Sequence, residues 1–166
     1  MNNTLIVFAS DHGTVEKCAR TLFRLIDGKV DICDLEQREV LPDLTTYDTI
    51  IVGGSIHSGK IQDGIAAFCD EHLDLLAGKR IGLFINCLYT GDKAEKQLDD
   101  AFPELLSQKA VVRDYFGGEV DELKLSFWER IITKQMIEQE DLVVALSKEK
   151  MERFATIIST ANAEEQ

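Results

Sequence analysis

Apolar residues along the chain form uninterrupted runs that alternate with segments of helical spacing. The uninterrupted runs cover residues 4–9 and 49–52, a pattern typical of strands that are buried on both faces. Residues 80–87 are predicted to form another central strand. Residues 30–35 alternate between apolar and polar side chains, which predicts a strand with one half-exposed face, and residues 109–116 are predicted to form the last strand. The chain therefore carries five predicted strands.

Helical periodicity fills the intervals between these strands. The first helix follows a turn at residues 10–14 and is predicted to end at Gly28, while residues 92–106 are predicted to form a helix interrupted near Pro103. A second helix precedes the run at residues 80–87, and an amphipathic helix closes the chain. The predicted inner faces of the first, second and last helices are Val15, Cys18, Ala19, Leu22, Phe23 and Ile26; Ile61, Ile65, Phe68, Cys69 and Leu73; and Met151, Phe154, Ala155 and Ile158.

Strands that alternate with helices specify an α/β fold with a parallel sheet, and right-handed crossovers make it doubly wound. We predict one domain over residues 1–166, with a five-stranded parallel sheet in the order 2-1-3-4-5. The third strand is expected to end at Gly53-Gly54. Residues 117–146 form an insertion before the last helix, with a short helix of their own around residues 125–137.

The charge balance limits the classes of partner. The 166 residues include 18 Lys and Arg and 30 Asp and Glu, a formal net charge of −12. An acidic chain repels phosphate backbones, so nucleic acid is not expected as a partner, whereas basic faces of other proteins are. No apolar run approaches the roughly 18 residues of a transmembrane helix. The start of the chain lacks the features of a signal peptide, and the four cysteines are scattered, so we expect a cytoplasmic protein with reduced thiols and no metal cluster.

The order of strands predicts where a ligand binds. In a doubly wound sheet, ligands lie beyond the carboxyl ends of the strands, where the strand order reverses. Three predicted loops meet at that point, at residues 10–15, 55–60 and 88–93. The fold is shared by many activities, so the function has to be argued from these loops.

The first loop has the chemistry of a phosphate cradle. Gly13 lies in a direct strand-to-helix turn, where successive N–H groups and the positive helix end face an anion. Ser10 and Thr14 add hydroxyl donors, and His12 adds a positive charge when protonated. The loop matches neither GxxxxGK[ST] nor GxGxxG, which disfavours an NTPase and a dinucleotide site. A capped turn with nothing bound remains the alternative interpretation.

The other two loops offer groups that suit a flat ligand. Small residues surround His57 in the second loop, where close backbone approach to a ring is possible. Tyr89 in the third loop can cover a ring. The alternatives are that His57 is an exposed loop histidine and that Tyr89 caps the core.

Three stretches of the chain resemble a known family: LIVFASDHGTV at the start, IIVGGSIHSGK after the third strand, and FGGEVDELKLSFWERIITKQM in the insertion. They resemble the flavodoxin superfamily over essentially the full length of the chain, and within it the flavodoxin-like menaquinone-dependent protoporphyrinogen oxidases. The resemblance implies a flavodoxin-like fold, non-covalent FMN and a role in electron transport as an oxidoreductase. It implies no catalytic side chain and no metal ligand.

Carried over by position, the resemblance places the FMN phosphate on the first loop and the isoalloxazine ring between the other two. Two positions depart from the family pattern: Val15 stands where flavodoxins commonly have a hydroxyl residue, and Asp11 brings negative charge towards a phosphate. The residues implied at the cofactor are Ser10, Asp11, His12, Gly13, Thr14, Val15, Ser55, Ile56, His57, Ser58, Gly59, Asn86, Cys87, Leu88, Tyr89 and Gly91.

The insertion is acidic, unlike the basic insertion of the oxidases it resembles. Residues 119–141 contain seven acidic and three basic residues, a net charge of −4, and so lack the attraction of basic residues to an anionic membrane. An apolar stripe at helical spacing (Leu125, Trp128, Ile131, Ile132 and Met136) is interpreted as packing on the core. The alternative is a docking face for a partner or an apolar substrate.

The leading hypothesis is an FMN-binding redox protein that acts in electron transfer with redox partner proteins bearing basic surfaces. It leaves open whether the protein only carries electrons or oxidises protoporphyrinogen-like substrates, with quinone or porphyrinogen as partner. The alternative is a degenerate flavodoxin-like domain that lacks a cofactor and binds a protein partner. A phosphorelay receiver is disfavoured because the third strand ends without a carboxylate, and a thiol hydrolase would need Cys87 as nucleophile with His57 or His12 as base.

Overall fold

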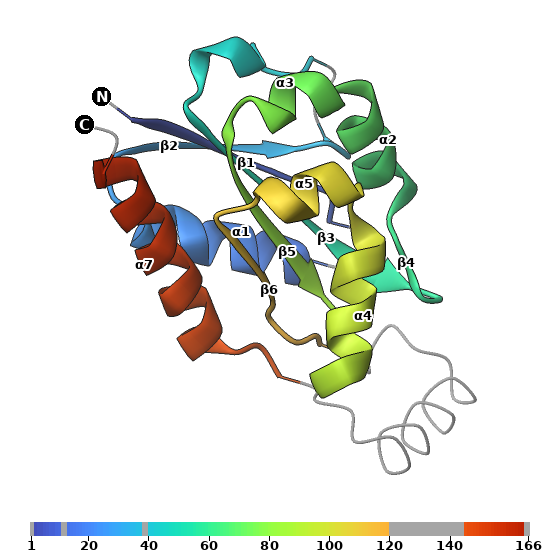
Figure 1. Cartoon of the computed structure of the whole chain (residues 1–166). Coiled ribbons are helices and arrows are strands. Elements are labelled where there is room, and N and C mark those ends of the chain that lie inside the picture. Colours follow the sequence, from blue (N-terminus) through green and yellow to red (C-terminus); the bar gives the residue numbers. More distant parts are fainter. Residues whose placement is uncertain (1, 11–12, 38–39, 120–144, 165–166) are drawn as a thin grey trace.

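The computed structural model describes residues 2–10, 13–37, 40–119 and 145–164, and Figure 1 shows a twisted sheet with helices on both faces. Five strands run parallel in the order β2-β1-β3-β5-β6, and the short β4 pairs with the end of β3 in an antiparallel hairpin. The predicted parallel α/β fold and the order 2-1-3-4-5 of its parallel strands are therefore confirmed. The strands are β1 (Asn3–Phe8), β2 (Lys29–Asp34), β3 (Thr49–His57), β4 (Lys60–Ile61), β5 (Arg80–Asn86) and β6 (Val112–Tyr115).

The helices divide between the two faces of the sheet, as Figure 1 shows. One apolar core contains the buried side chains of α1 and α7, and the other contains those of α2, α3, α4 and α5. The prediction that Phe23 lies on the inner face of the first helix is wrong, because its side chain is 45% exposed. None of the helices in the described part of the chain is long and apolar enough to cross a membrane. The helices are α1 (Thr14–Leu25), the 3₁₀ turn η1 (Leu44–Thr46), α2 (Asp63–Glu71), α3 (Leu73–Ala77), α4 (Gly91–Ala101), α5 (Glu104–Lys109) and α7 (Lys148–Glu164).

The middle of each central strand is apolar because each face of the sheet meets a different core. In β1, Leu5 and Val7 point into the core under α2 to α5, while Ile6 and Phe8 point into the core under α1 and α7. All four side chains are at most 1% exposed. Side chains of a strand alternate between the two faces, so burial on both sides removes the polar positions that an exposed face would carry.

The third strand was predicted to end at Gly53-Gly54, but in the structure it continues to His57. A Cβ atom on Gly53 would lie 2.0 Å from the Phe84 ring, so this glycine makes room for a neighbouring aromatic side chain inside the sheet. Ile61 was predicted on the second helix but belongs to β4, and α2 begins at Asp63. Leu73, predicted on the same helix, begins the separate helix α3.

The elements after β5 agree more closely with the sequence prediction. The predicted break near Pro103 separates α4 from α5, because proline lacks the N–H that would continue the helix. The last strand is shorter than predicted and begins at Val112. The predicted helix at residues 125–137 and most of the insertion lie outside the described residues.

A buried polar cluster fixes α7 to the amino ends of the central strands. Oδ1 of Asn162 accepts hydrogen bonds from Nη1 of Arg80 at 2.6 Å and from the hydroxyl of Thr49 at 2.7 Å. Its Nδ2 donates to the hydroxyl of Thr4 at 3.3 Å. All four residues are at most 8% exposed. The cluster lies at the end of the sheet opposite to the loops of the predicted ligand site, because all the central strands run the same way.

Candidate functional site

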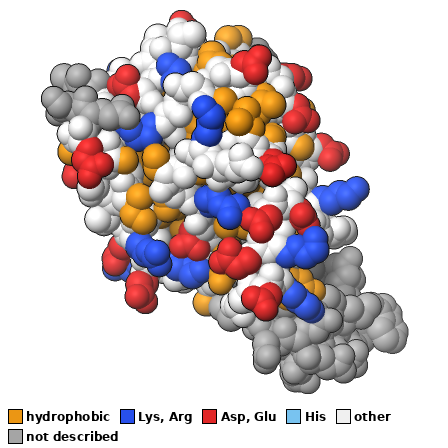
Figure 2. Space-filling view, viewed as in Figure 1, with side chains coloured by type: hydrophobic (Ala, Val, Ile, Leu, Met, Phe, Trp, Pro, Cys, Tyr) orange, Lys and Arg blue, Asp and Glu red, His pale blue; other side chains and the backbone are white. Residues whose placement is uncertain are grey.

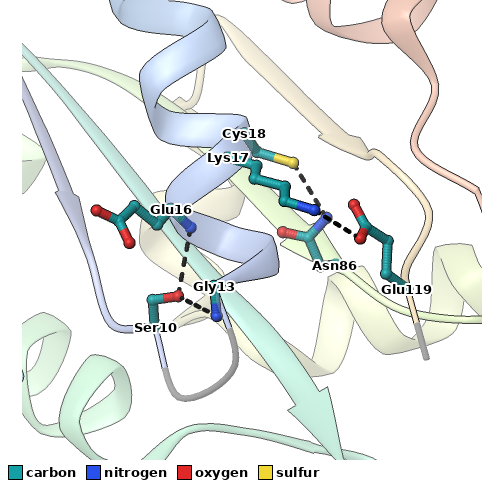
Figure 3. A network of polar contacts seen from close by, with 7 residues as sticks. All are labelled: Ser10, Gly13, Glu16, Lys17, Cys18, Asn86 and Glu119. Atoms are coloured by element: carbon teal, nitrogen blue, oxygen red, sulfur yellow. Dashed lines mark hydrogen bonds and ion pairs between the residues drawn. The ribbon is translucent and has the colours of Figure 1, made fainter. Parts of the chain in front are cut away.

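The turn between β1 and α1 is closed by a serine side chain. Oγ of Ser10 accepts from the backbone N–H groups of Gly13 at 3.0 Å and Glu16 at 3.4 Å (Figure 3). Gly13 is the N-cap residue of α1 with φ 86°, a left-handed conformation that favours glycine. Ser10 thus links the end of β1 to the start of α1, and its hydroxyl hydrogen remains able to donate to a ligand.

The first turn of α1 presents backbone donors at the ligand end of the sheet. The N–H groups of Thr14 and Val15 have no acceptor inside the helix, because the first turn lacks a preceding carbonyl. The side chain of Val15 is 2% exposed and packs in the core beside Phe8. A hydroxyl in place of the Val15 side chain would point into that core, so only the Val15 backbone N–H is suited to an anion here.

The end of β3 is braced against the end of β1 by Gln62. Nε2 of Gln62 donates to the carbonyl of Ala9 at 2.9 Å, and its Oε1 accepts from the N–H of Ser55 at 3.0 Å. A Cβ atom on Gly54 would lie 2.9 Å from that Oε1, so a glycine at this position leaves room for the brace. No sequence pattern pointed to Gln62, since a glutamine that follows an apolar residue has no distinctive spacing.

A tight hairpin carries the predicted second loop. Ser58 and Gly59 both have positive φ, 52° and 79°, as a two-residue type I′ turn requires. His57 pairs with Lys60 across the hairpin and is exposed. The Nε2 atom of His57 lies 2.8 Å from Oγ of Ser55, which fixes the imidazole at the rim of the site.

Asn86, the last residue of β5, brings an unpartnered acceptor to the site. Its Nδ2 donates to the carbonyl of Gly117 at 2.9 Å and to Sγ of Cys18 at 3.3 Å, and Figure 3 shows the amide beside the thiol. Asn86 is 3% exposed, and within the described residues its Oδ1 has no hydrogen-bond partner. A buried acceptor without a partner is uncommon in proteins, so a donor on a ligand is the natural complement. Burial raises the pKa of the Cys18 thiol to about 11, so this thiol stays protonated.

Two adjoining cavities follow the carboxyl ends of β1, β3 and β5. The first, of about 170 Å³, lies between α1 and β5, and the second, of about 310 Å³, lies towards the loop that contains Tyr89. They share Ile56, Cys87 and Leu88 as walls. The first is lined by Ser10, Thr14, Val15, Ser55, Ile56, His57, Asn86, Cys87, Leu88, Gly118 and Glu119, and the second by Ile56, Ser58, Gly59, Cys87, Leu88, Tyr89 and Gln97.

The structure brings most of the predicted site residues together and separates a few. Every described residue of the prediction lines one of the two cavities except Gly13 and Gly91, which shape the starts of α1 and α4. Asp11 and His12 lie outside the described residues. The assignment of these residues to FMN stays a prediction, because no ligand defines their contacts.

Three cavity residues were missed by the sequence analysis: Gln97, Gly118 and Glu119. A Cβ atom on Gly118 would lie 2.8 Å from Cδ2 of Leu88, so a glycine here lets the segment after β6 approach the loop after β5. The pair Gly117-Gly118 was the available signal in the sequence. Glu119 forms an ion pair with Lys17, with 2.9 Å between Oε2 and Nζ (Figure 3).

The structure disfavours the two alternative functions, a thiol hydrolase and a phosphorelay receiver. Burial raises the pKa of the Cys87 thiol, and its Sγ contacts the carbonyl of Tyr89 at 3.6 Å, so the thiolate that a hydrolase needs is disfavoured. A receiver needs a carboxylate at the carboxyl end of β3, and residues 53–59 contain none. Among the residues that the structure describes, no group of three His, Cys, Asp or Glu side chains could hold a metal ion.

Comparisons with known proteins agree on one family. The flavodoxin domain family matches residues 5–141 of the chain. A flavodoxin from the domain Archaea is 18% identical, with 97% of this chain and 99% of that chain covered and a TM-score of 0.56. The flavodoxin, WrbA-like protein from Agrobacterium tumefaciens is 16% identical, with 99% and 97% covered and a TM-score of 0.58.

A larger protein shares the same fold over part of its length. Rubredoxin oxygen:oxidoreductase from the anaerobe Desulfovibrio gigas is 18% identical to the chain, with a TM-score of 0.57. The match covers 99% of this chain but 37% of that chain. The search of curated proteins found no match. At these identities the structural likenesses show the fold alone.

Proposed function

Because the chain belongs to the flavodoxin family, whose cofactor is FMN, we propose that it is an FMN-binding electron-transfer protein that holds the flavin in the two adjoining cavities. The observation that carries the placement is Asn86: its buried acceptor, fixed by two hydrogen bonds from its own amide nitrogen, belongs to a residue that lines the first cavity together with the start of α1. The second cavity, which contains Tyr89, adjoins the first. FMN has a phosphate, a chain of hydroxyl groups and a flat ring, which match these three features in order.

The residues present fit each part of the cofactor. The phosphate suits the N–H groups of Thr14 and Val15 and the hydroxyl of Ser10, because a helix amino terminus favours an anion. A hydroxyl of the ribityl chain suits Oδ1 of Asn86, which needs a donor. The ring suits the second cavity, where Tyr89 supplies an aromatic face.

Bound FMN supplies the redox chemistry, and the chain's own residues bind and orient it. Ile56 and Leu88, shared by both cavities, exclude water from the ring. Lys93 places its Nζ 4.8 Å from the centre of the Tyr89 ring, a cation–π contact that fixes the outer wall of the second cavity. The Gln62 brace holds the Ser55 end of β3 at a constant distance from β1.

The charge of the chain supports a basic redox partner. A net charge of −12 attracts basic proteins over distances of about a Debye length. Figure 2 shows acidic and basic side chains interspersed on one face rather than gathered by sign, so on that face the attraction comes from the net charge. We infer a cytoplasmic protein that is reduced by a basic reductase, and we expect the reduction rate to fall as ionic strength rises.

A narrower candidate is a protoporphyrinogen-oxidase-like activity, with quinone or porphyrinogen as partner. It is supported by the sequence resemblance at residues 116–136, most of which lie outside the described residues. Anaerobic turnover of protoporphyrinogen with a menaquinone analogue by the FMN-loaded protein tests it. Flavin reduction by a reductase without porphyrinogen turnover would assign the protein to the electron carriers.

The spectrum of the purified protein tests the broad proposal. An oxidised-flavin absorption spectrum, restored by added FMN after removal of the cofactor, is the expected result. Reduction by a flavodoxin reductase, with electrons passed on to cytochrome c as an artificial acceptor, would establish electron transfer. A colourless protein that ignores added FMN would favour the alternative, a domain that has lost its cofactor and binds a protein partner.

A further inference from the structure

The first cavity is lined by an acidic residue, Glu119, whose negative charge opposes the binding of a phosphate. The carboxylate of Glu119 lines this cavity together with Ser10, Thr14 and Val15, which form the anion-binding side. A carboxylate and a phosphate that line one cavity repel each other, although water screens part of the repulsion because the Glu119 side chain is 36% exposed. This arrangement requires a compensating positive charge.

Lys17 supplies that charge from α1. Its Nζ lies 2.9 Å from Oε2 of Glu119, and Figure 3 shows the pair beside Asn86. Lys17 follows Thr14 by three positions, so its side chain starts one turn beyond the helix end that faces the anion. Glu119 lies just beyond β6, so the pair joins α1 to the opposite wall of the cavity.

We propose that Lys17 makes the site able to bind the phosphorylated flavin, FMN, by neutralising Glu119, and that the binding of riboflavin does not depend on this neutralisation. Lys17 cancels the charge of Glu119 and so permits the phosphate at the end of α1. Riboflavin has the same ring and hydroxyl chain but no phosphate, so its binding is insensitive to the pair. The inference rests on the proposed function, because it presumes that a flavin occupies the two cavities.

The test is a double-mutant cycle measured with two ligands. Dissociation constants for FMN and riboflavin are determined by quenching of flavin fluorescence for the wild type, Lys17→Met, Glu119→Gln and the double variant. We expect Lys17→Met to weaken FMN binding by at least about tenfold and riboflavin binding by less than about twofold, because only FMN then faces an unpaired carboxylate. The double variant should recover FMN binding to within about threefold of the wild type.

Lys96→Met is the matched control. Lys96 forms an ion pair with Asp100 at 2.6 Å on α4, is more exposed than Lys17 and lines neither cavity. It makes the same change in net charge, so a similar loss of FMN affinity in Lys96→Met and Lys17→Met would overturn the proposal. Equal losses of FMN and riboflavin in Lys17→Met would also overturn it, since they would indicate structural damage.

The outcomes separate this inference from the proposed function. A wild type that binds neither flavin would refute the function, and the inference with it. A wild type that binds FMN while all four variants keep its affinity would refute the inference and leave the function standing. Circular dichroism and the unfolding midpoint of each variant identify any variant that has lost its fold.

Discussion

Replacing Gln62 with leucine should destabilise the protein by removing the side chain that joins the ends of β1 and β3. Two backbone groups then lose their partners: the carbonyl of Ala9 and the N–H of Ser55. Gln62 is 9% exposed, so water replaces it poorly. An unsatisfied buried polar group costs about 1–3 kcal/mol. Because Ser55 is only half-buried, we expect a total loss of about 2–4 kcal/mol in the free energy of unfolding.

Urea unfolding of Gln62→Leu and Gln108→Leu measures this effect against a matched control. Gln108 donates one hydrogen bond to Glu104 at 3.1 Å on the exposed face of α5, so its replacement should change stability by no more than about 0.5 kcal/mol. Hydrogen exchange of the Ser55 amide should accelerate in Gln62→Leu alone. Equal stabilities of the two variants, with unchanged hydrogen exchange at Ser55, would show that Gln62 does not stabilise the ends of β1 and β3.

Two further predictions concern stability. Asn162→Ala removes the acceptor shared by buried Arg80 and Thr49 and the amide that donates to Thr4, and should lower the free energy of unfolding in urea by about 2–4 kcal/mol, because three buried polar groups each lose a hydrogen bond; a loss below about 1 kcal/mol would contradict this role. Burial raises the pKa of the Cys18 and Cys69 thiols from 9.0 to about 11 and about 12. Above pH 9 the unfolded chain therefore releases protons that the folded chain retains, so stability should fall by up to about 1.4 kcal/mol per pH unit for each thiol, until pH 11 and 12 respectively. Urea unfolding from pH 8 to 10.5 checks this, and a Cys69→Ala variant should show a shallower fall.

Much of the fold could be predicted because buried strands produce recognisable runs of apolar residues in the sequence. The run of apolar residues and glycine at positions 81–85 identifies a central strand, and the parallel arrangement of the strands follows from their alternation with helices. The end of β3 could not be predicted in the same way. Glycine is common in turns, yet Gly53 lies inside the sheet. A glycine is needed there because the Phe84 ring occupies the space that a side chain at position 53 would fill. Such a requirement depends on a residue 31 positions away, which no local pattern shows.

The sequence predicted where the candidate site lies and which cofactor it would bind, but not all of the residues that line it. The FMN cofactor and the broad role of an electron-transfer flavoprotein, both inferred from the resemblance, are confirmed at the level of the family. Gln62 and Glu119 were missed because each reaches the site from a segment with no motif of its own. The two departures from the family pattern have different outcomes: the Val15 side chain packs in the core, while Asp11 lies outside the described residues.

We propose that the two adjoining cavities bind FMN through the Oδ1 acceptor of Asn86. The decisive experiment is titration of the cofactor-free protein with FMN, followed by flavin fluorescence in the wild type and in Asn86→Leu. We expect quenching at one FMN per chain in the wild type and affinity at least about tenfold lower in the variant, because leucine removes the buried acceptor. A wild type that leaves FMN fluorescence unchanged, or a variant with the affinity of the wild type, would contradict it.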